Sequence, residues 1–302
     1  MERLHGVIAA MATPFADDGS VDEKTLRELT DRLIDDGVHG LIPCGSTGEF
    51  PAMTHEERRQ VTEAVIAQAA GRVPVVPHTG AMTTREAIEL SRHAEQAGAA
   101  GVMVVAPYYE ALSAAEAKDY YRQVAGSVAI DVMIYNLPAA TGINLAPDDI
   151  RVLAGESPNI RYVKDTSGDF DQATVLIHSL SDVVTTFVGM DTAYLASLTE
   201  GADGAVVGAA NFLGPALAGI YDRVKAGDLA SAQSSWARIF GMMKALGGAS
   251  AYVQGVKGAM RIAGYPVGDP RAPIRPLEGT RAGQFETLLS GIDPHLLTGG
   301  RP

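Results

Sequence analysis

Eight short apolar runs recur along the chain, and helical patterns of apolar and polar residues lie between them. The runs are nearly continuous rather than alternating with polar residues, as expected of strands that are buried on both faces. They lie at Val7–Met11, Val38–Pro43, Val73–Pro77, Gly101–Ala106, Ile130–Tyr135, Ile160–Lys164, Thr185–Gly189 and Gly204–Val207. The pattern therefore predicts a parallel sheet whose strands are joined by helices.

Capping residues mark where several of these helices begin and end. Gly37, Gly98 and Gly201 each stand shortly before a predicted strand, in a position that suits the left-handed residue after a helix. They are separated by two and three units of roughly 30–35 residues, the length of one strand–helix unit. Three pairs have the spacing of a capping box ahead of an amphipathic stretch: Thr54 and Glu57, Thr83 and Glu86, and Ser113 and Glu116.

Eight strand–helix units predict an α/β fold, a (β/α)8 TIM barrel with additional C-terminal helices. An open, doubly wound sheet is the alternative, but such a sheet would be expected to carry a G-x-G-x-x-G motif after its first strand, and the chain has none there. We expect a catalytic barrel over residues 1–226 and a helical extension over 227–302 packed on it. The helices expected late in the chain are Pro215–Ala226, Leu229–Gly247, Ser250–Ala263 and Gly279–Leu289.

Composition and charge narrow the class of protein. The 302 residues are 46% hydrophobic, enough to bury one large core. The net charge of -12 argues against nucleic-acid binding, because a phosphate backbone would be repelled. The apolar run from Val7 to Ala12 is too short for a membrane span, and the single Cys44 permits no intramolecular disulfide. We therefore expect a cytoplasmic protein that binds neither membrane nor nucleic acid.

The active sites of such barrels form at the carboxyl ends of the strands, and a lysine stands at one of these ends. Lys164 closes the apolar strand that begins at Ile160, so its side chain is expected inside the mouth of the barrel. Burial there favours the neutral amine, which can attack a carbonyl carbon. The alternative is a lysine that reaches to the surface or pairs with Asp165.

Two further strand ends carry polar groups. Tyr135 ends the strand before that of Lys164, where its phenol could exchange protons with a lysine adduct; an ordinary core tyrosine is the alternative. Residues 45–48 offer two hydroxyls and backbone N–H groups that suit a carboxylate, or form a plain turn. Cys44 is expected to be a small buried residue, Glu49 a structural acid rather than a base, and Trp236 a packing residue. The seven histidines show no metal-binding spacing, so no metal site is predicted.

Together and in this order, these features resemble the dihydrodipicolinate synthase and N-acetylneuraminate lyase superfamily of pyruvate-dependent class I aldolases. The similarity runs nearly end to end, from Ala12-Thr13-Pro14-Phe15 to the late helix of Lys257. The most specific pieces are G-S-T-G-E at 45–49, Y-N-L-P at 135–138 and K-D-T-S-G-D at 164–169.

The resemblance implies roles for the matching residues. Lys164 matches the Schiff-base lysine, Tyr135 the tyrosine that relays protons, and Thr47 the threonine that links this tyrosine to a second one. Tyr109 matches a tyrosine that reaches into the neighbouring subunit's site, which implies a homodimer or homotetramer. Ser46 and Thr47 match the clamp for the pyruvate carboxylate, and Gly189, Asp191 and Gly208 the pocket for the second substrate. The substrate-binding residues expected are Ser46, Thr47, Gly48, Thr166, Gly189, Asp191 and Gly208.

The implied chemistry needs no metal and no organic cofactor. The lysine condenses with the 2-oxo group of pyruvate, the iminium makes C3 acidic, and the resulting enamine attacks an aldehyde. The reverse reaction cleaves a 4-hydroxy-2-oxo acid into pyruvate and an aldehyde. Pyruvate and a small aldehyde or 2-oxo acid are therefore the expected partners.

Departures from the family pattern bear on the second substrate. Dihydrodipicolinate synthases usually carry an arginine after the catalytic tyrosine, and the corresponding residue here is Ala140. Their late N-P-I-P-V-K segment is Tyr252–Lys257 here, with only the last two residues kept. We therefore expect an aldolase for 2-keto-3-deoxy sugar acids. There are three alternatives. The first is a dihydrodipicolinate synthase in which another arginine, such as Arg161 or Arg261, holds the second carboxylate. The others are a dehydratase that uses the same lysine and a non-catalytic 2-oxo-acid sensor.

Overall fold

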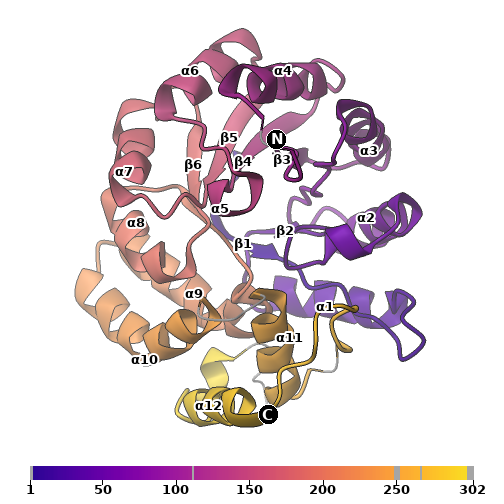
Figure 1. Cartoon of the computed structure of the whole chain (residues 1–302). Coiled ribbons are helices and arrows are strands. Elements are labelled where there is room, and N and C mark those ends of the chain that lie inside the picture. The colour runs from indigo at the N-terminus through magenta and orange to yellow at the C-terminus, as the bar shows by residue number, and fades with distance from the viewer. Residues whose placement is uncertain (1–2, 111, 248–251, 266, 298–302) are drawn as a thin grey trace.

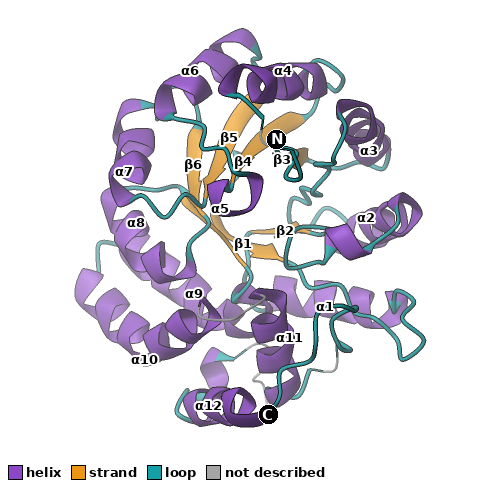
Figure 2. Ribbon diagram, in the orientation of Figure 1, coloured by secondary structure: helices purple, strands orange, loops and turns teal. Residues whose placement is uncertain are grey.

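Parallel strands form the wall of a barrel, and helices surround it on the outside (Figures 1 and 2). This arrangement is seen in a computed structural model that describes residues 3–110, 112–247, 252–265 and 267–297. All strand pairings are parallel, and the strand order around the wall is β2-β1-β7-β6-β5-β4-β3. The strands are β1 (Gly6–Ala10), β2 (Gly40–Ile42), β3 (Gly101–Val105), β4 (Asp131–Asn136), β5 (Ile160–Asp165), β6 (Thr185–Val188) and β7 (Gly204–Val207).

The segment predicted as a strand over Val73–Pro77 closes the wall between β2 and β3 without forming a regular strand. Leu41 of β2 donates its N–H to the Pro74 carbonyl, and Met103 of β3 donates to the Pro77 carbonyl. Proline has no N–H to donate, so two prolines in five residues interrupt a continuous ladder. The predicted regular strand is therefore wrong: this part of the chain is joined to β2 by the isolated bridge of Val75 with Leu41, and to β3 by that of the next residue, His78, with Met103.

The outer helices begin and end largely where the capping residues predict. Thr54 and Ser113 form complete capping boxes, whereas Thr83 accepts from the Glu86 N–H without the reciprocal backbone bond. Gly37, Gly98 and Gly201 have φ of 85°, 92° and 108°, so the expected left-handed helix exits are confirmed. The helices are α1 (Glu23–Asp35), α2 (His55–Ala69), α3 (Thr84–Gln96), α4 (Ala114–Ala125), α5 (Pro138–Thr141), α6 (Pro147–Glu156), α7 (Phe170–Ser179), α8 (Tyr194–Glu200) and α9 (Ala210–Lys225).

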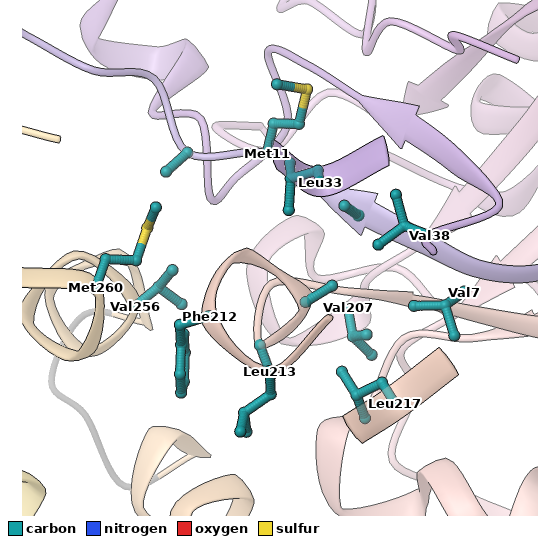
Figure 3. Packing of buried hydrophobic residues seen from close by; sticks show 14 of the residues in the cluster. Val7, Met11, Leu33, Val38, Val207, Phe212, Leu213, Leu217, Val256 and Met260 are labelled. Carbon is teal, nitrogen blue, oxygen red and sulfur yellow. The ribbon is translucent and has the colours of Figure 1, made fainter. Parts of the chain in front are cut away.

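Three further helices follow the barrel, and short 3-10 turns flank several loops. These helices are α10 (Leu229–Gly247), α11 (Tyr252–Ile262) and α12 (Gly279–Ser290); the turns are η1 (Phe50–Ala52), η2 (Asp191–Ala193) and η3 (Pro294–Leu296). Ser250, where the third late helix was expected to begin, lies outside the described residues. In Figure 3, Val256 and Met260 of α11 lie beside Phe212 of α9, within one continuous buried cluster. The proposed division at residues 226 and 227 stays a prediction.

The interior of the barrel is filled by side chains from its own strands, among them Ile8, Met103, Met133 and Phe187, which are all fully buried. This packed layer leaves the carboxyl ends of the strands as the place for a site. Trp236 packs against the ring of Tyr194 at 5.8 Å, and Cys44 is buried, so both behave as structural residues. Within the described residues, no helix has the length and apolarity needed to cross a bilayer.

Candidate active site

Lys164 and Tyr135 lie side by side at the carboxyl ends of β5 and β4. The parallel register pairs the two residues directly, so their side chains point to the same face of the sheet. Both are buried, at 6% and 5% exposure. The Nζ atom of Lys164 lies 3.9 Å from the centre of the Tyr135 ring.

Asp165 does not pair with Lys164, so this alternative is excluded. Successive residues of a strand point to opposite faces, and the Asp165 carboxylate is held on the outer side of β5. It accepts hydrogen bonds from Asn136, Gln172 and Ser167 at 3.0, 3.1 and 2.7 Å. Within the described part of the chain, the Lys164 ammonium has no carboxylate as an ion-pair partner.

The loop after β2 brings backbone donors to the same mouth. The N–H groups of Ser46, Thr47 and Gly48 donate to no described residue, whereas the N–H of Glu49 closes the turn on the Ser46 carbonyl at 3.1 Å. The side chain of Thr47 is buried, while Ser46 is exposed. A side chain at Gly48 would crowd the backbone, because a Cβ there would lie 3.1 Å from both the Cys44 nitrogen and the Met11 oxygen. The loop can thus present adjacent free N–H groups to an anion.

Gly189 makes room for the lysine. A Cβ at this position would lie 2.8 Å from Cε of Lys164 and 2.0 Å from Oγ1 of Thr166. The Thr166 hydroxyl is buried and has no hydrogen-bond partner in the described structure. An unpartnered buried hydroxyl beside a free amine is a group that a bound ligand would satisfy.

Asp191 and Gly208 meet a residue that the sequence did not single out as functional. Tyr252, at the start of α11, hydrogen-bonds the Asp191 carboxylate. A Cβ at Gly208 would lie 2.8 Å from the Tyr252 hydroxyl and 2.9 Å from Oγ1 of Thr47, so the absence of a side chain lets these two groups approach. The C-terminal extension therefore contributes directly to the mouth of the barrel.

The electrostatics of Asp191 follow from its burial. Desolvation raises the pKa of this carboxyl to about 6, and the Tyr252 hydrogen bond and the nearby Lys164 charge only partly oppose it. Its Oδ1 is buried without a hydrogen-bond partner in the described structure. The same environment raises the pKa of the Tyr252 phenol, first through burial and then through the Asp191 charge. Asp191 can therefore accept one further hydrogen bond.

Tyr109 stands apart from this group. Its side chain is 84% exposed in the single chain, so the described structure does not bring it into this chain's own site. A tyrosine this exposed is free to contact a second subunit.

The loop after Tyr135 offers no cation. Ala140 is exposed on α5. The alternative arginines are engaged elsewhere: Arg161 lies 3.8 Å from Asp131 at the start of β4, and Arg261 donates to Asp269 and to the Leu277 carbonyl.

Two further polar side chains near the carboxyl ends of the strands, Thr141 and Asn211, are also engaged. The Thr141 hydroxyl bonds to the carbonyls of Leu137 and Ile143. The Asn211 amide is fully buried against the backbone of Ala10, Ala12 and Gly208. Among the groups named for the second substrate, Asp191 is thus the one with a free buried acceptor atom.

Comparisons with known proteins show which family the chain belongs to. The model of the dihydrodipicolinate synthetase family matches residues 3–292. The chain belongs to that family. It is therefore an enzyme of the pyruvate-dependent class I aldolase and lyase type, built on the (β/α)8 barrel predicted from its sequence.

Relatives within the family carry more than one activity in their names. The chain is 35% identical to a 4-hydroxy-tetrahydrodipicolinate synthase of Haloarcula marismortui, over 96% of this chain and 94% of that protein. It is 34% identical to a probable 2-dehydro-3-deoxy-D-pentonate aldolase of Escherichia coli, over 88% and 90%. A solved structure of the Escherichia coli prophage protein YagE in complex with pyruvate has a TM-score of 0.91, 34% identity and 96% and 98% coverage.

Proposed function

We propose that this enzyme forms a Schiff base between Lys164 and pyruvate and uses the adduct to make or break a carbon–carbon bond with an aldehyde. The observation that supports the proposal best is the position of Lys164. It is a buried amine without an ion-pair partner in the described structure, 3.9 Å from the Tyr135 ring at the carboxyl end of the barrel. An amine in such a place can reach the carbonyl carbon of a bound 2-oxo acid.

The reaction is then a sequence of proton transfers around one covalent adduct. Nζ of Lys164 attacks C2 of pyruvate, and the 2-oxo oxygen leaves as water to give an iminium. Loss of a C3 proton gives an enamine, whose C3 attacks the aldehyde carbon while the aldehyde oxygen takes up a proton. Tyr135 is the proposed proton relay, and Thr47 positions it. Hydrolysis of the new iminium releases the 4-hydroxy-2-oxo acid.

Pyruvate is held, in this proposal, through its carboxylate. The free N–H groups of Ser46, Thr47 and Gly48 supply donors without a formal charge, together with the Ser46 and Thr47 hydroxyls. Thr166 adds a buried hydroxyl next to the lysine. Backbone donors in a turn bind anions well because the loop fixes their orientation before the anion binds.

For the second substrate, the pocket favours a neutral hydroxyaldehyde, as released from 2-keto-3-deoxy sugar acids. A carboxylate brought into a largely desolvated pocket needs a charged or multiply hydrogen-bonding partner. Ala140 supplies none, and Arg161 and Arg261 are engaged elsewhere. Above pH 6 the buried Asp191 would repel a second carboxylate but accept a hydrogen bond from a hydroxyl.

The second candidate is 4-hydroxy-tetrahydrodipicolinate synthase, which condenses pyruvate with aspartate semialdehyde. It is favoured by the names of relatives that are 34–37% identical over most of the chain. In that case the group that holds the second carboxylate must come from outside the single chain.

We also propose that the active form is a homodimer or homotetramer in which Tyr109 reaches a neighbouring site, and that the enzyme works in the cytoplasm.

Borohydride trapping tests the Schiff base. Reduction in the presence of pyruvate should attach a reduced pyruvyl group to Lys164 in peptide mass mapping, and Lys164→Ala should abolish both label and turnover. Labelling at another residue, or none at saturating pyruvate, contradicts the proposal. The kcat/KM for pyruvate with glyceraldehyde, set against that with aspartate semialdehyde, then decides between the two second substrates.

A further inference from the structure

A buried ion pair joins the C-terminal extension to the loop that carries the proposed carboxylate clamp. Lys257 of α11 and Glu49 lie with Nζ and Oε1 2.7 Å apart, and each side chain is only 1% exposed. Burying one charge of either sign without a partner is costly, so each of these groups needs the other. We propose that Glu49 and Lys257 are positioning residues that hold the clamp loop in its pyruvate-binding form, an inference that rests on the proposed function.

Glu49 is fixed at both ends. Its backbone is left-handed, with φ of 59°, and its N–H closes the turn on the Ser46 carbonyl. Its other carboxylate oxygen, Oε2, accepts a hydrogen bond from the backbone N–H of Arg271 at 2.8 Å. A non-glycine residue in this conformation is held there by its surroundings, because the left-handed region costs energy. The side-chain contacts of Glu49 therefore help to keep the turn closed.

Lys257 is fixed from the other side. Its ammonium donates to the Asp269 carbonyl at 3.2 Å and lies 4.3 Å from the centre of the Phe15 ring. Burial lowers the pKa of this amine, and the Glu49 carboxylate opposes the shift. The cation is thus stabilised in this place by the Glu49 carboxylate.

The pair lies where a displacement would reach the site. Glu49 follows directly after Ser46, Thr47 and Gly48, the residues with free N–H groups, and the Gly48 carbonyl accepts from the Thr13 hydroxyl at 2.8 Å. The same helix α11 begins with Tyr252, which contacts Asp191. Helix α11 therefore orients the pocket for the second substrate directly and the pyruvate clamp through Glu49.

The test measures pyruvate binding and turnover separately. Lys257→Met and Glu49→Gln are compared with Lys244→Met, the same kind of substitution at an exposed residue of α10. For each variant, the pyruvate concentration that gives half-maximal borohydride trapping at Lys164 is measured, together with the trapped fraction at saturation. We expect the half-saturating concentration to rise by about tenfold or more in both pair variants, the size expected for losing one good hydrogen bond to a charged group. The saturating fraction should stay at the wild-type level.

The double variant Glu49→Gln/Lys257→Met separates positioning from mere loss of packing. It leaves no buried charge unpaired, so its half-saturating concentration should lie closer to that of the wild type than the Lys257→Met value does. If Lys257→Met does not fold, Glu49→Gln decides, because glutamine keeps the size and can still accept from the Arg271 N–H. The inference is overturned if the half-saturating pyruvate concentration of Glu49→Gln, and that of Lys257→Met where this variant folds, lie within twofold of the value for Lys244→Met. Absence of trapping in the wild type would instead refute the proposed function.

Discussion

The ammonium group of Lys164 lies over the ring of Tyr135, 3.9 Å from its centre, because β4 and β5 are parallel and in register at these two residues. The arrangement holds the phenol close to the amine independently of any bound ligand. The ring face stabilises a cation, while the hydroxyl at the ring edge stays available for proton exchange. The ring and the hydroxyl can therefore be separated by mutation.

Tyr135→Phe keeps the ring and removes the hydroxyl. If the phenol transfers protons in the rate-limiting step, turnover should fall by about 10²–10⁴-fold. Trapping of pyruvate on Lys164 should persist, because the lysine keeps its neighbour. Steady-state kinetics and borohydride labelling measure the two effects. A loss of turnover of less than about tenfold, well short of that range, would mean that water or another group transfers the proton.

Tyr109 allows a test of the assembly. Its side chain is 84% exposed in the isolated chain, which fits a residue that completes a partner's site. Light scattering of the active enzyme should give a dimer or larger. Tyr109→Phe should slow turnover while leaving iminium formation largely intact. A monomer with full activity is incompatible with this role for Tyr109.

Gly189→Ala tests how closely the lysine is packed. The new methyl group would lie 2.8 Å from Cε of Lys164 and 2.0 Å from Oγ1 of Thr166, so both side chains must move. A displacement of about 1 Å at a reacting group can cost about 10²-fold in rate, and we expect a loss of kcat/KM of that order. Gly155→Ala, in α6 with nothing near the added methyl group, is the control. Equal activity of the two variants would show that Lys164 has room to adjust.

Local signals in the sequence were sufficient to predict where Lys164 and Tyr135 lie, because each closes a continuous apolar run. The prediction of a regular strand over Val73–Pro77 was wrong. It rested on apolar composition and did not take into account that Pro74 and Pro77 have no N–H to donate to a neighbouring strand. Tyr252 was noted only as a departure from the N-P-I-P-V-K pattern. Its contact with Asp191 depends on how α11 folds back over the barrel mouth, which no local pattern encodes.

The titration of Asp191 should change the stability of the enzyme in a direction that follows from its raised pKa. Its pKa is about 6 in the folded protein and 3.8 for an unperturbed aspartate, chiefly because burial disfavours the carboxylate. The folded state thus binds the proton more tightly than the unfolded state. The favourable contribution of this group is fully present below pH 4 and is lost as the pH rises to about 6 and beyond. The loss corresponds to at most about 3 kcal/mol, since one pKa unit is worth about 1.4 kcal/mol.

Asp191→Asn removes this titration while keeping the shape of the side chain. The free energy of unfolding of the variant minus that of the wild type should be larger at pH 7.5 than at pH 4.5, by roughly 1–3 kcal/mol, so the variant is relatively more stable at the higher pH. Urea unfolding at the two pH values measures this difference; a difference that is the same at both would mean that the pKa of Asp191 is not raised in the folded protein.

The same variant tests the role of Asp191 in activity. Wild-type kcat/KM for a hydroxyaldehyde should fall below about pH 6, as the carboxylate that accepts the substrate hydroxyl becomes protonated. Because asparagine has no such group, the variant should lack this acidic limb and have a lower, pH-independent value across that range. If the limb remains in Asp191→Asn, another group titrates, and the role of Asp191 in binding the second substrate is wrong.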